Sequence, residues 1–139
     1  MKPALEGKQL AGSFRYLGKL GLKELRACAR AVDIYLLPSL WENCPYSCLE
    51  AMASGRAIVC SDQGGMPELI EDGVTGLLAT SEDPPSYSEQ LTRLIENSTL
   101  RHTLGAAARC FVEGNLMDTR IADLSADTYR RCIPDIQIG

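Results

Sequence analysis

The sequence has very little histidine: His102 is the only one, and no C-x-x-C pair occurs. A zinc site needs clustered cysteine and histidine ligands, so these absences argue against a zinc centre. Six cysteines are present, at positions 28, 44, 48, 60, 110 and 132. An even number allows disulfides, but the large apolar fraction favours reduced thiols packed as small hydrophobic side chains. Cys44 and Cys48 have no histidine nearby, so neither is expected to be a nucleophile or a metal ligand.

The chain also lacks a long apolar run and a basic cluster. No stretch approaches the length of a membrane span, and Met1-Lys2-Pro3 opens no signal peptide. The net charge is -4 at pH 7, whereas a nucleic-acid binder needs a basic surface. We therefore expect a cytoplasmic protein with no integral membrane segment and no nucleic-acid partner. A small anion held by backbone N–H groups remains compatible with this charge.

What the sequence does contain is a regular alternation of short apolar runs and amphipathic stretches. Its 139 residues, 45% of them hydrophobic, suit one domain, with residues 1–12 as a leader and residues 13–139 as the domain. The runs predict strands over 13–17, 33–39, 57–61 and 76–80. Helical periodicity predicts helices over 22–32, 46–54, 66–72, 86–97, 98–114 and 117–133. Ser98 or Thr99 is expected to cap its helix, and Ile121, Leu124 and Thr128 are expected to face inward.

These strands lack the polar alternation of a half-exposed sheet, and helices separate them. That pattern predicts an α/β fold with helices on both faces of a partial, Rossmann-like parallel sheet of about four strands. Ligands of such sheets bind at the carboxyl ends of the strands. The loop that follows strand 33–39 is therefore the first place to look for a site.

That loop opens the segment "WENCPYSCLEAMASG", residues 41–55. Pro45 suits the first turn of a helix, where its missing N–H is not needed. The N–H groups of Tyr46, Ser47 and Cys48 would then point out of the helix end. Together with the helix dipole they predict an anion site that fits a phosphate.

Two carboxylates flank the predicted anion site. Glu50 cannot bind a phosphate, but it can accept hydrogen bonds from a pair of hydroxyls, as carboxylates do with ribose. Glu42 could accept from other hydroxyls or stabilise positive charge. A sugar phosphate would match this layout. Two simpler interpretations stay open, because Ser47 and Glu50 have the spacing of a capping box and Glu42 could be a solvated loop charge.

A second motif, "SDQGGMPELI" over residues 61–70, places two glycines between a strand and a helix. Glycines let a backbone approach a ligand or adopt positive φ. The stretch is neither G-x-G-x-x-G nor a P-loop, so it is weak support for nucleotide binding. A tight turn into a short helix is the alternative, with Pro67 and Glu68 in the first helical turn.

Taken together, residues 16–78 resemble the C-terminal, donor-binding domain of the GT-B glycosyltransferases, specifically the large retaining family 4 group. The resemblance depends on the E-x7-E pair with "EAMASG", followed by "GGMPELIEDGVTGLL". It continues more loosely through residues 101–132. It implies the C-terminal half of a GT-B donor domain.

The resemblance also implies roles for individual residues. The donor would be a nucleotide-diphosphate sugar, with no cofactor and no metal, and the sequence has no D-x-D motif. Glu42 would contact the donor sugar and carry catalysis, and Glu50 would contact the ribose hydroxyls. The strand end at Gly18 and Lys19 would lie near the base. The loop backbone that would approach the sugar and diphosphate comprises Asn43, Cys44, Pro45, Tyr46 and Ser47. The implied reaction is hexosyl transfer to a glycan, a lipid or a small acceptor, with retention of configuration.

Two features of the family are missing from these residues. The acceptor-binding N-terminal domain has no counterpart, and neither do two upstream βα units that carry an arginine and a lysine for the diphosphate. Without those cations we expect negligible transferase activity from this chain alone. The uncovered sheet edge is expected to invite homo-oligomers. Two alternatives therefore stay open: a non-catalytic module that binds a nucleotide sugar or sugar phosphate, and a structural or oligomerisation domain.

Overall fold

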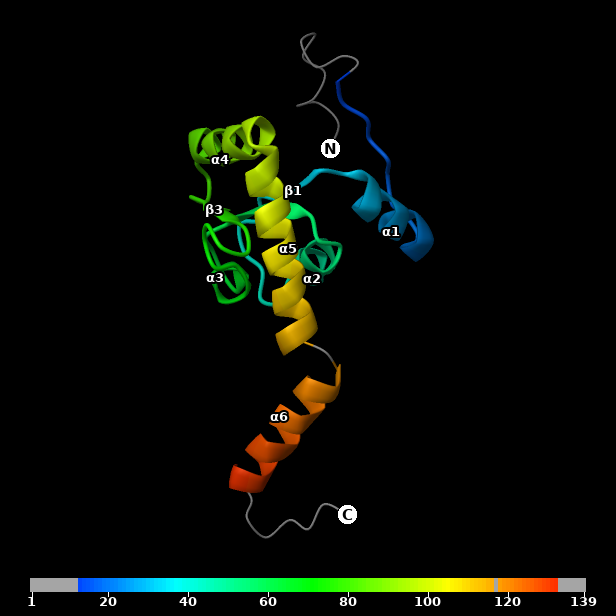
Figure 1. The fold of residues 1–139 in the computed structure, drawn as a ribbon, viewed down its shortest axis with the longest axis vertical. Helices are drawn as coiled ribbons and strands as arrows, with labels where there is room; N and C mark the ends of the chain where they lie inside the picture. The colour runs from blue at the N-terminus through cyan, green and yellow to red at the C-terminus, as the bar shows by residue number, and fades with distance from the viewer. Residues whose placement is uncertain (1–12, 117, 133–139) are drawn as a thin grey trace.

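A three-stranded parallel sheet lies at the centre of the protein (Figure 1). The computed structural model describes residues 13–116 and 118–132, so the predicted leader over residues 1–12 lies outside the described residues. The strands are β1 (Ile34–Leu37), β2 (Ala57–Ser61) and β3 (Leu77–Ala79), in the order β1-β2-β3. Every residue of β2 is buried, which explains why this strand shows no polar alternation.

In the described ranges six helices surround or extend from the sheet, and their alternation with the strands confirms the predicted α/β class. Their bounds are α1 (Leu22–Ala31), α2 (Tyr46–Ala53), α3 (Met66–Leu69), α4 (Pro84–Glu96), α5 (Ser98–Asn115) and α6 (Asp118–Cys132). Within the described ranges, none of these helices is long and apolar enough to cross a membrane.

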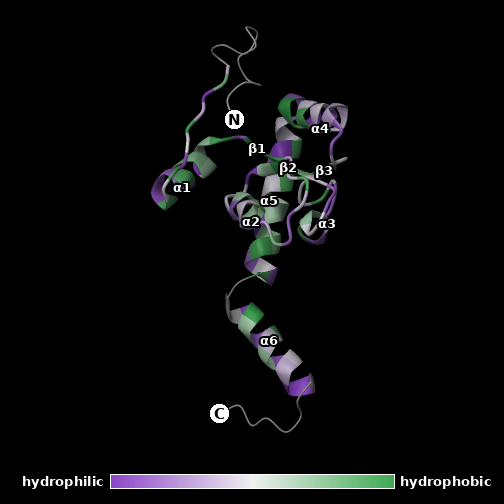
Figure 2. Ribbon diagram, turned by 180° about the vertical axis from the view of Figure 1, so that it is seen from behind, coloured by the Kyte–Doolittle hydropathy of each residue, from purple (hydrophilic) through white to green (hydrophobic). Residues whose placement is uncertain are grey.

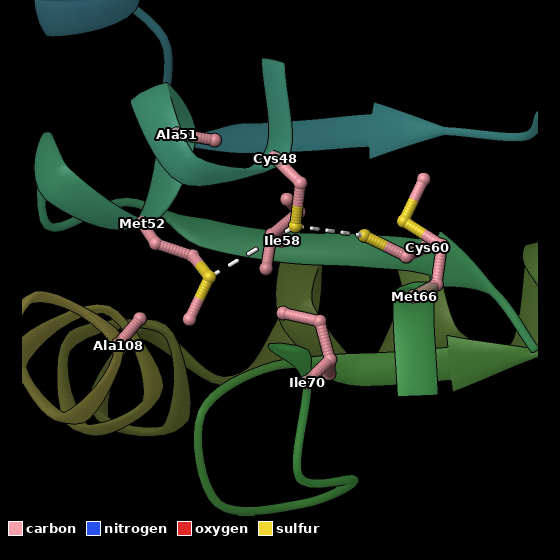
Figure 3. Packing of buried hydrophobic residues seen from close by; sticks show 8 residues of the cluster. All are labelled: Cys48, Ala51, Met52, Ile58, Cys60, Met66, Ile70 and Ala108. Carbon is pink, nitrogen blue, oxygen red and sulfur yellow. Dashed lines mark hydrogen bonds between the residues drawn. The ribbon is translucent and has the colours of Figure 1, made fainter. Parts of the chain in front are cut away.

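Helices cover both faces of the sheet, as predicted, because alternate residues of β2 point to opposite sides. Ile58 and Cys60 pack with side chains of α2, α3 and α5 on one face (Figure 3). Ala57 and Val59 pack with side chains of β3, α4 and α5 on the other face. Helix α5 thus contributes to both apolar clusters and ties the two layers together.

The close approach of α5 to the start of β2 depends on a glycine. A Cβ added at Gly105 would lie inside 3.0 Å of the Gly55 carbonyl oxygen. Gly55 itself follows the last turn of α2 with a φ of 69°, the left-handed conformation that glycine adopts at helix ends. The two glycines therefore let the amino end of β2 lie directly against the middle of α5.

The prediction of a strand over residues 13–17 was wrong. These residues form no regular element and are exposed, so the described sheet has three strands rather than about four. A strand needs a hydrogen-bonding neighbour, and no strand of the described chain pairs with the second edge of β1. Phe14 and Tyr16 have strand-forming side chains, but propensity cannot replace a missing partner.

Two details of the C-terminal helices also differ from the predictions. The cap of α5 is Asn97, whose side chain accepts the N–H of Leu100 at 2.9 Å, rather than Ser98 or Thr99. Helix α6 begins at Asp118, but Ile121, Leu124 and Thr128 are exposed rather than turned inward. Figures 1 and 2 show the reason, because α6 extends away from the sheet and no described element covers its apolar side.

Candidate functional site

The β1–α2 loop, residues 38–45, leaves the carboxyl end of β1 and leads into α2. This is the position that the sequence predicted for a ligand-binding loop. The loop ends at Pro45, which is the N-cap residue of α2. Its φ of -77° and ψ of 94° place it in extended backbone, so the chain turns into the helix at Tyr46.

The amino end of α2 offers fewer free N–H groups than predicted. The N–H of Cys48 donates to the Pro45 carbonyl oxygen at 2.9 Å, so this predicted anion donor is already used. Within the part of the chain that the structure describes, the N–H groups of Tyr46 and Ser47 have no acceptor. With the dipole of α2, these two N–H groups remain available to an anion, so the predicted anion site stays a prediction with two donors rather than three.

The alternative interpretation of Glu50 as part of a capping box is wrong. No side chain of the described residues caps α2, because the helix begins one residue before Ser47 and Pro45 occupies the N-cap position. The Glu50 side chain is exposed and lines a pocket of about 520 Å³. The complete lining is Leu25, Arg26, Ala29, Arg30, Tyr35, Glu50, Ala53, Ser54 and Arg109.

The electrostatics of this pocket follow from a phenol that faces a carboxylate. Burial raises the pKa of Tyr35 above 10.0, and the negative charge of Glu50 raises it further. Tyr35 therefore stays protonated at neutral pH and can donate or accept a hydrogen bond. Tyr35 and Glu50 thus line this pocket together with three basic residues, Arg26, Arg30 and Arg109.

The other predicted carboxylate, Glu42, is not among the residues that line this pocket. It is half-buried in the β1–α2 loop. Its Oε1 accepts a hydrogen bond from the Ser39 hydroxyl at 3.2 Å. The interpretation of Glu42 as a freely solvated loop charge therefore does not hold. Its carboxylate is directed by a neighbour within the loop.

The sequence did not reveal that the two glycines of the second motif contact this loop. The N–H of Gly65 donates to the carbonyl oxygen of Glu42 at 2.7 Å. A Cβ at Gly64 would lie inside 3.0 Å of that same oxygen, and a Cβ at Gly65 would lie inside 3.0 Å of the Asn43 carbonyl oxygen. The glycines thus serve a close approach of two backbone segments, and Gly64 also has a φ of 62°.

Gly18 and Lys19 are both exposed and precede α1. Gly18 has a φ of 69°, and a Cβ there would meet nothing within 4 Å, so its backbone conformation rather than crowding requires glycine. Neither residue lines the pocket beside Glu50. Their expected place near a nucleotide base stays a prediction. In residues 13–116 and 118–132, no group of three or more acidic, cysteine or histidine side chains is arranged to hold a metal ion.

Comparison with known families identifies the class to which this fold and loop belong. The family model described as "Glycosyl transferases group 1" matches residues 1–97, which is more than half of the chain. The chain belongs to the group 1 glycosyltransferases.

Individual relatives agree with this assignment. A D-inositol 3-phosphate glycosyltransferase of Streptomyces griseus is 30% identical over 126 residues, which are 91% of this chain and 26% of that protein. The crystallised C-terminal domain of the group 1 glycosyltransferase LpcC of Francisella tularensis has a TM-score of 0.68 at 28% identity. That match covers 73% of this chain and 53% of that domain. The Anabaena protein HepE in complex with UDP has a TM-score of 0.69 at 25% identity, over 73% of this chain and 28% of that chain.

The relatives are much longer than the matched region. The chain spans about a quarter to a third of the curated proteins it matches, and about half of the LpcC domain. The residues described here therefore correspond to one part of a larger glycosyltransferase architecture.

Proposed function

We propose that this chain supplies the donor-binding side of a cytoplasmic, retaining hexosyltransferase of GT-B family 4, with a nucleotide-diphosphate sugar as donor. The observation that carries the proposal is the segment from Glu42 to Glu50. It runs from the carboxyl end of β1 into α2. It joins a hydrogen-bonded carboxylate, two N–H groups that have no acceptor among the described residues, and a pocket-lining carboxylate. Structures of HepE with UDP support a nucleotide partner for this fold. The acceptor, a glycan, a lipid or a small molecule, would bind to an N-terminal domain.

In this proposal each part of the donor meets a different part of the segment. The diphosphate approaches the N–H groups of Tyr46 and Ser47, where the dipole of α2 favours negative charge. The backbone of Asn43 and Cys44 lines the same approach, and Pro45 shapes it without offering an N–H. Backbone groups make these contacts, so they do not depend on which side chains the loop carries.

The two glutamates receive the hydroxyl-rich parts of the donor. Glu50 accepts hydrogen bonds from the ribose hydroxyls at the pocket that it shares with Tyr35. Glu42 faces the donor sugar, with its carboxylate directed by Ser39. Gly18 and Lys19 lie toward the base.

The same layout suits the charges of glycosyl transfer. Positive charge develops on the sugar ring in an oxocarbenium-like transition state, and the Glu42 carboxylate would stabilise it. Negative charge develops on the leaving diphosphate, and the N–H groups at the amino end of α2 would stabilise that oxygen. Glu42 is therefore the residue that we assign to catalysis.

A second candidate function is a non-catalytic module that binds a nucleotide sugar or sugar phosphate. The observation that favours it is the absence of lysine and arginine from the sequence of the β1–α2 loop and the first turn of α2, residues 38–48. Backbone N–H groups can bind a diphosphate in the ground state, but a full positive charge stabilises a leaving diphosphate far better. We expect this chain alone to bind a donor and to turn it over negligibly.

A third candidate is association through β1. The strand consists of three aliphatic residues and Tyr35, and within the described residues it pairs on one side only. Leu36 is 41% exposed. An open apolar edge is a surface for strand pairing with another molecule. Sedimentation at increasing protein concentration tests it, and a monomer at every concentration would remove this candidate.

Calorimetric titration of the chain with UDP, GDP, ADP and their glucose conjugates tests the main proposal. Saturable binding is expected for one base, and Glu50→Gln should weaken it about tenfold by removing an anionic acceptor. Glu68→Gln is the matched control, because Glu68 is an exposed helical glutamate outside the pocket. Equal affinities of wild type and Glu50→Gln would exclude a ribose contact at Glu50. Absence of binding to all six compounds would refute the proposal for this chain.

A further inference from the structure

The β1–α2 loop is held in place by a segment that lies about twenty residues further along the chain. The β2–α3 turn, residues 62–65, follows the carboxyl end of β2, next to the loop that leaves β1. The Gly65 N–H donates to the Glu42 carbonyl oxygen at 2.7 Å. The backbone of the proposed catalytic residue is therefore bonded directly to the neighbouring turn.

This contact leaves no room for side chains in the turn. A Cβ at Gly64 would meet the carbonyl oxygen and nitrogen of Glu42, and a Cβ at Gly65 would meet the carbonyl of Asn43, each inside the closest approach seen for real Cβ atoms. The obstructing atoms are backbone atoms, so no rotation of a side chain can relieve the clash. A substitution must displace the loop or the turn.

The turn is the better anchored of the two segments. The Asp62 N–H donates to the Ala79 carbonyl oxygen at 3.0 Å, and the Ser81 N–H donates to Asp62 Oδ1 at 3.0 Å. These two bonds fasten the start of the turn to the end of β3. A clash with Gly64 or Gly65 is therefore expected to move the loop rather than the turn.

A second contact fixes the Glu42 side chain itself. The Ser39 hydroxyl donates to Glu42 Oε1 at 3.2 Å. Gly65, which follows Glu42 in the sequence, thus bonds to its main chain, and Ser39, which precedes it, bonds to its carboxylate. These two hydrogen bonds restrict the positions that the Glu42 carboxylate can take on an otherwise irregular loop.

We infer that Gly64, Gly65 and Ser39 are positioning residues: the glycines seat the β1–α2 loop on the turn, and Ser39 aims the Glu42 carboxylate at the donor sugar. The inference rests on the proposed function for the role of Glu42, but the seating of the loop does not. A displacement of about 1 Å in a reacting geometry can cost roughly a hundredfold in rate. Positioning of this kind would therefore be functionally significant without any direct contact between these three residues and the donor.

The experiment compares Gly64→Ala and Gly65→Ala with Gly73→Ala. Gly73 has a φ of 75°, similar to the 62° of Gly64, but a Cβ there meets nothing within 4 Å. Gly73→Ala thus reproduces the backbone strain of Gly64→Ala without the clash. Circular dichroism first establishes that each variant is folded.

Trp41 provides a readout that does not depend on nucleotide binding. It is the only tryptophan of the chain, it precedes Glu42, and it is 71% exposed, so its fluorescence reports the loop. Time-resolved anisotropy of Trp41 should show a faster local motion in Gly64→Ala and Gly65→Ala and no change in Gly73→Ala. Unchanged Trp41 dynamics in both loop-facing variants would overturn the inference.

Titration with UDP-glucose gives the functional readout. Gly65→Ala should weaken binding at least about tenfold, whereas Gly73→Ala should bind like the wild type. If the wild type binds no UDP-glucose but Gly65→Ala still shows faster local motion of Trp41, the contact between the glycines and the loop is supported and the proposed function fails. Wild-type affinity in both Gly64→Ala and Gly65→Ala would overturn the positioning role.

The Ser39 variants test the inference without a backbone clash, and they decide it if the glycine variants do not fold. Ser39→Ala should weaken UDP-glucose binding while leaving the thermal midpoint unchanged. Ser39→Thr keeps the hydroxyl and should restore binding. Equal affinities for alanine, threonine and serine at this position would remove Ser39 from the positioning set.

Discussion

Tyr35 and Glu50 face the same pocket, and the negative charge of Glu50 adds to the effect of burial in raising the Tyr35 pKa. Tyr35 belongs to β1 and Glu50 to the middle of α2. Residues of α1 line the same pocket, so Glu50 lies on the side of α2 that borders β1 and α1. The carboxylate that the sequence singled out is thus directed into a concave surface.

This relationship predicts how Tyr35 titrates. The difference in phenolate absorbance between wild type and Tyr35→Phe isolates one of the five tyrosines, and its midpoint should lie above 10.0. Glu50→Gln should lower that midpoint, because it removes a negative charge that opposes ionisation. The midpoint should still exceed 10.0, since burial is the larger cause. An unchanged midpoint in Glu50→Gln would show that the two groups do not face each other.

The same shift predicts a loss of stability at alkaline pH. The folded-state pKa of Tyr35 is raised, so the folded chain retains a proton that the unfolded chain releases near pH 10. The stabilisation is complete below pH 10 and is lost as pH rises through the folded-state pKa. Urea unfolding between pH 9 and pH 12 should show a shallower alkaline decline in Tyr35→Phe. Parallel declines in both proteins would contradict this assignment.

Gly105→Ala should destabilise the protein although alanine is the better helix former. Alanine in the middle of a helix gains up to about 1 kcal/mol over glycine. Here the new Cβ would clash with the Gly55 carbonyl oxygen, and overpacking costs about 1–3 kcal/mol. The free energy of unfolding in urea should therefore fall for Gly105→Ala.

Gly114→Ala is the control on the same helix. A Cβ there meets nothing within 4 Å, so propensity alone acts, and stability should be unchanged or rise by up to about 1 kcal/mol near the helix end. A stabilising effect of Gly105→Ala equal to that of Gly114→Ala would mean that α5 does not lie against Gly55.

The N-cap of α5 is Asn97 in the structure, whereas the sequence predicted Ser98 or Thr99. The side chain of Asn97 accepts the Leu100 N–H at 2.9 Å, so Asn97→Ala should cost about 1 kcal/mol in the free energy of unfolding. Ser98→Ala should change it by less than about 0.5 kcal/mol, as expected for an exposed position without a cap bond. The reverse order of the two effects would restore Ser98 as the cap.

Much of the fold could be predicted from local patterns. Strand β2 occupies the predicted residues 57–61, and α2 occupies 46–53 of the predicted 46–54, because apolar runs and glycine stops are encoded within a few residues. Local patterns did not suffice for residues 13–17, where the predicted strand is absent. Their composition favours a strand, but a strand exists only where another strand accepts its hydrogen bonds.

The site shows the same division. The loop, both glutamates and the glycine pair could be selected from the sequence as candidates for the site. The sequence could not show that Gly64 and Gly65 approach Glu42 and Asn43, because that contact joins segments about twenty residues apart. Nor could it show that Cys48 bonds back to Pro45 and removes one of the three expected anion donors. The first contact depends on long-range packing, and the second depends on the residue at which α2 begins.

Tyr46→Pro should test the anion-binding end of α2 without disturbing its fold. Tyr46 is the first residue of the helix, where proline is tolerated, and Pro45 before it is already extended, as a residue preceding proline must be. The substitution removes one free N–H, and the loss of a hydrogen bond to a charged group should weaken UDP binding about tenfold to a hundredfold. Tyr46→Ala is the control, because it removes the same side chain, which is 76% exposed, and keeps the N–H. Uridine, which has no phosphate, should bind both variants equally, and UDP affinities that are equal in the two variants would exclude this N–H as a phosphate donor.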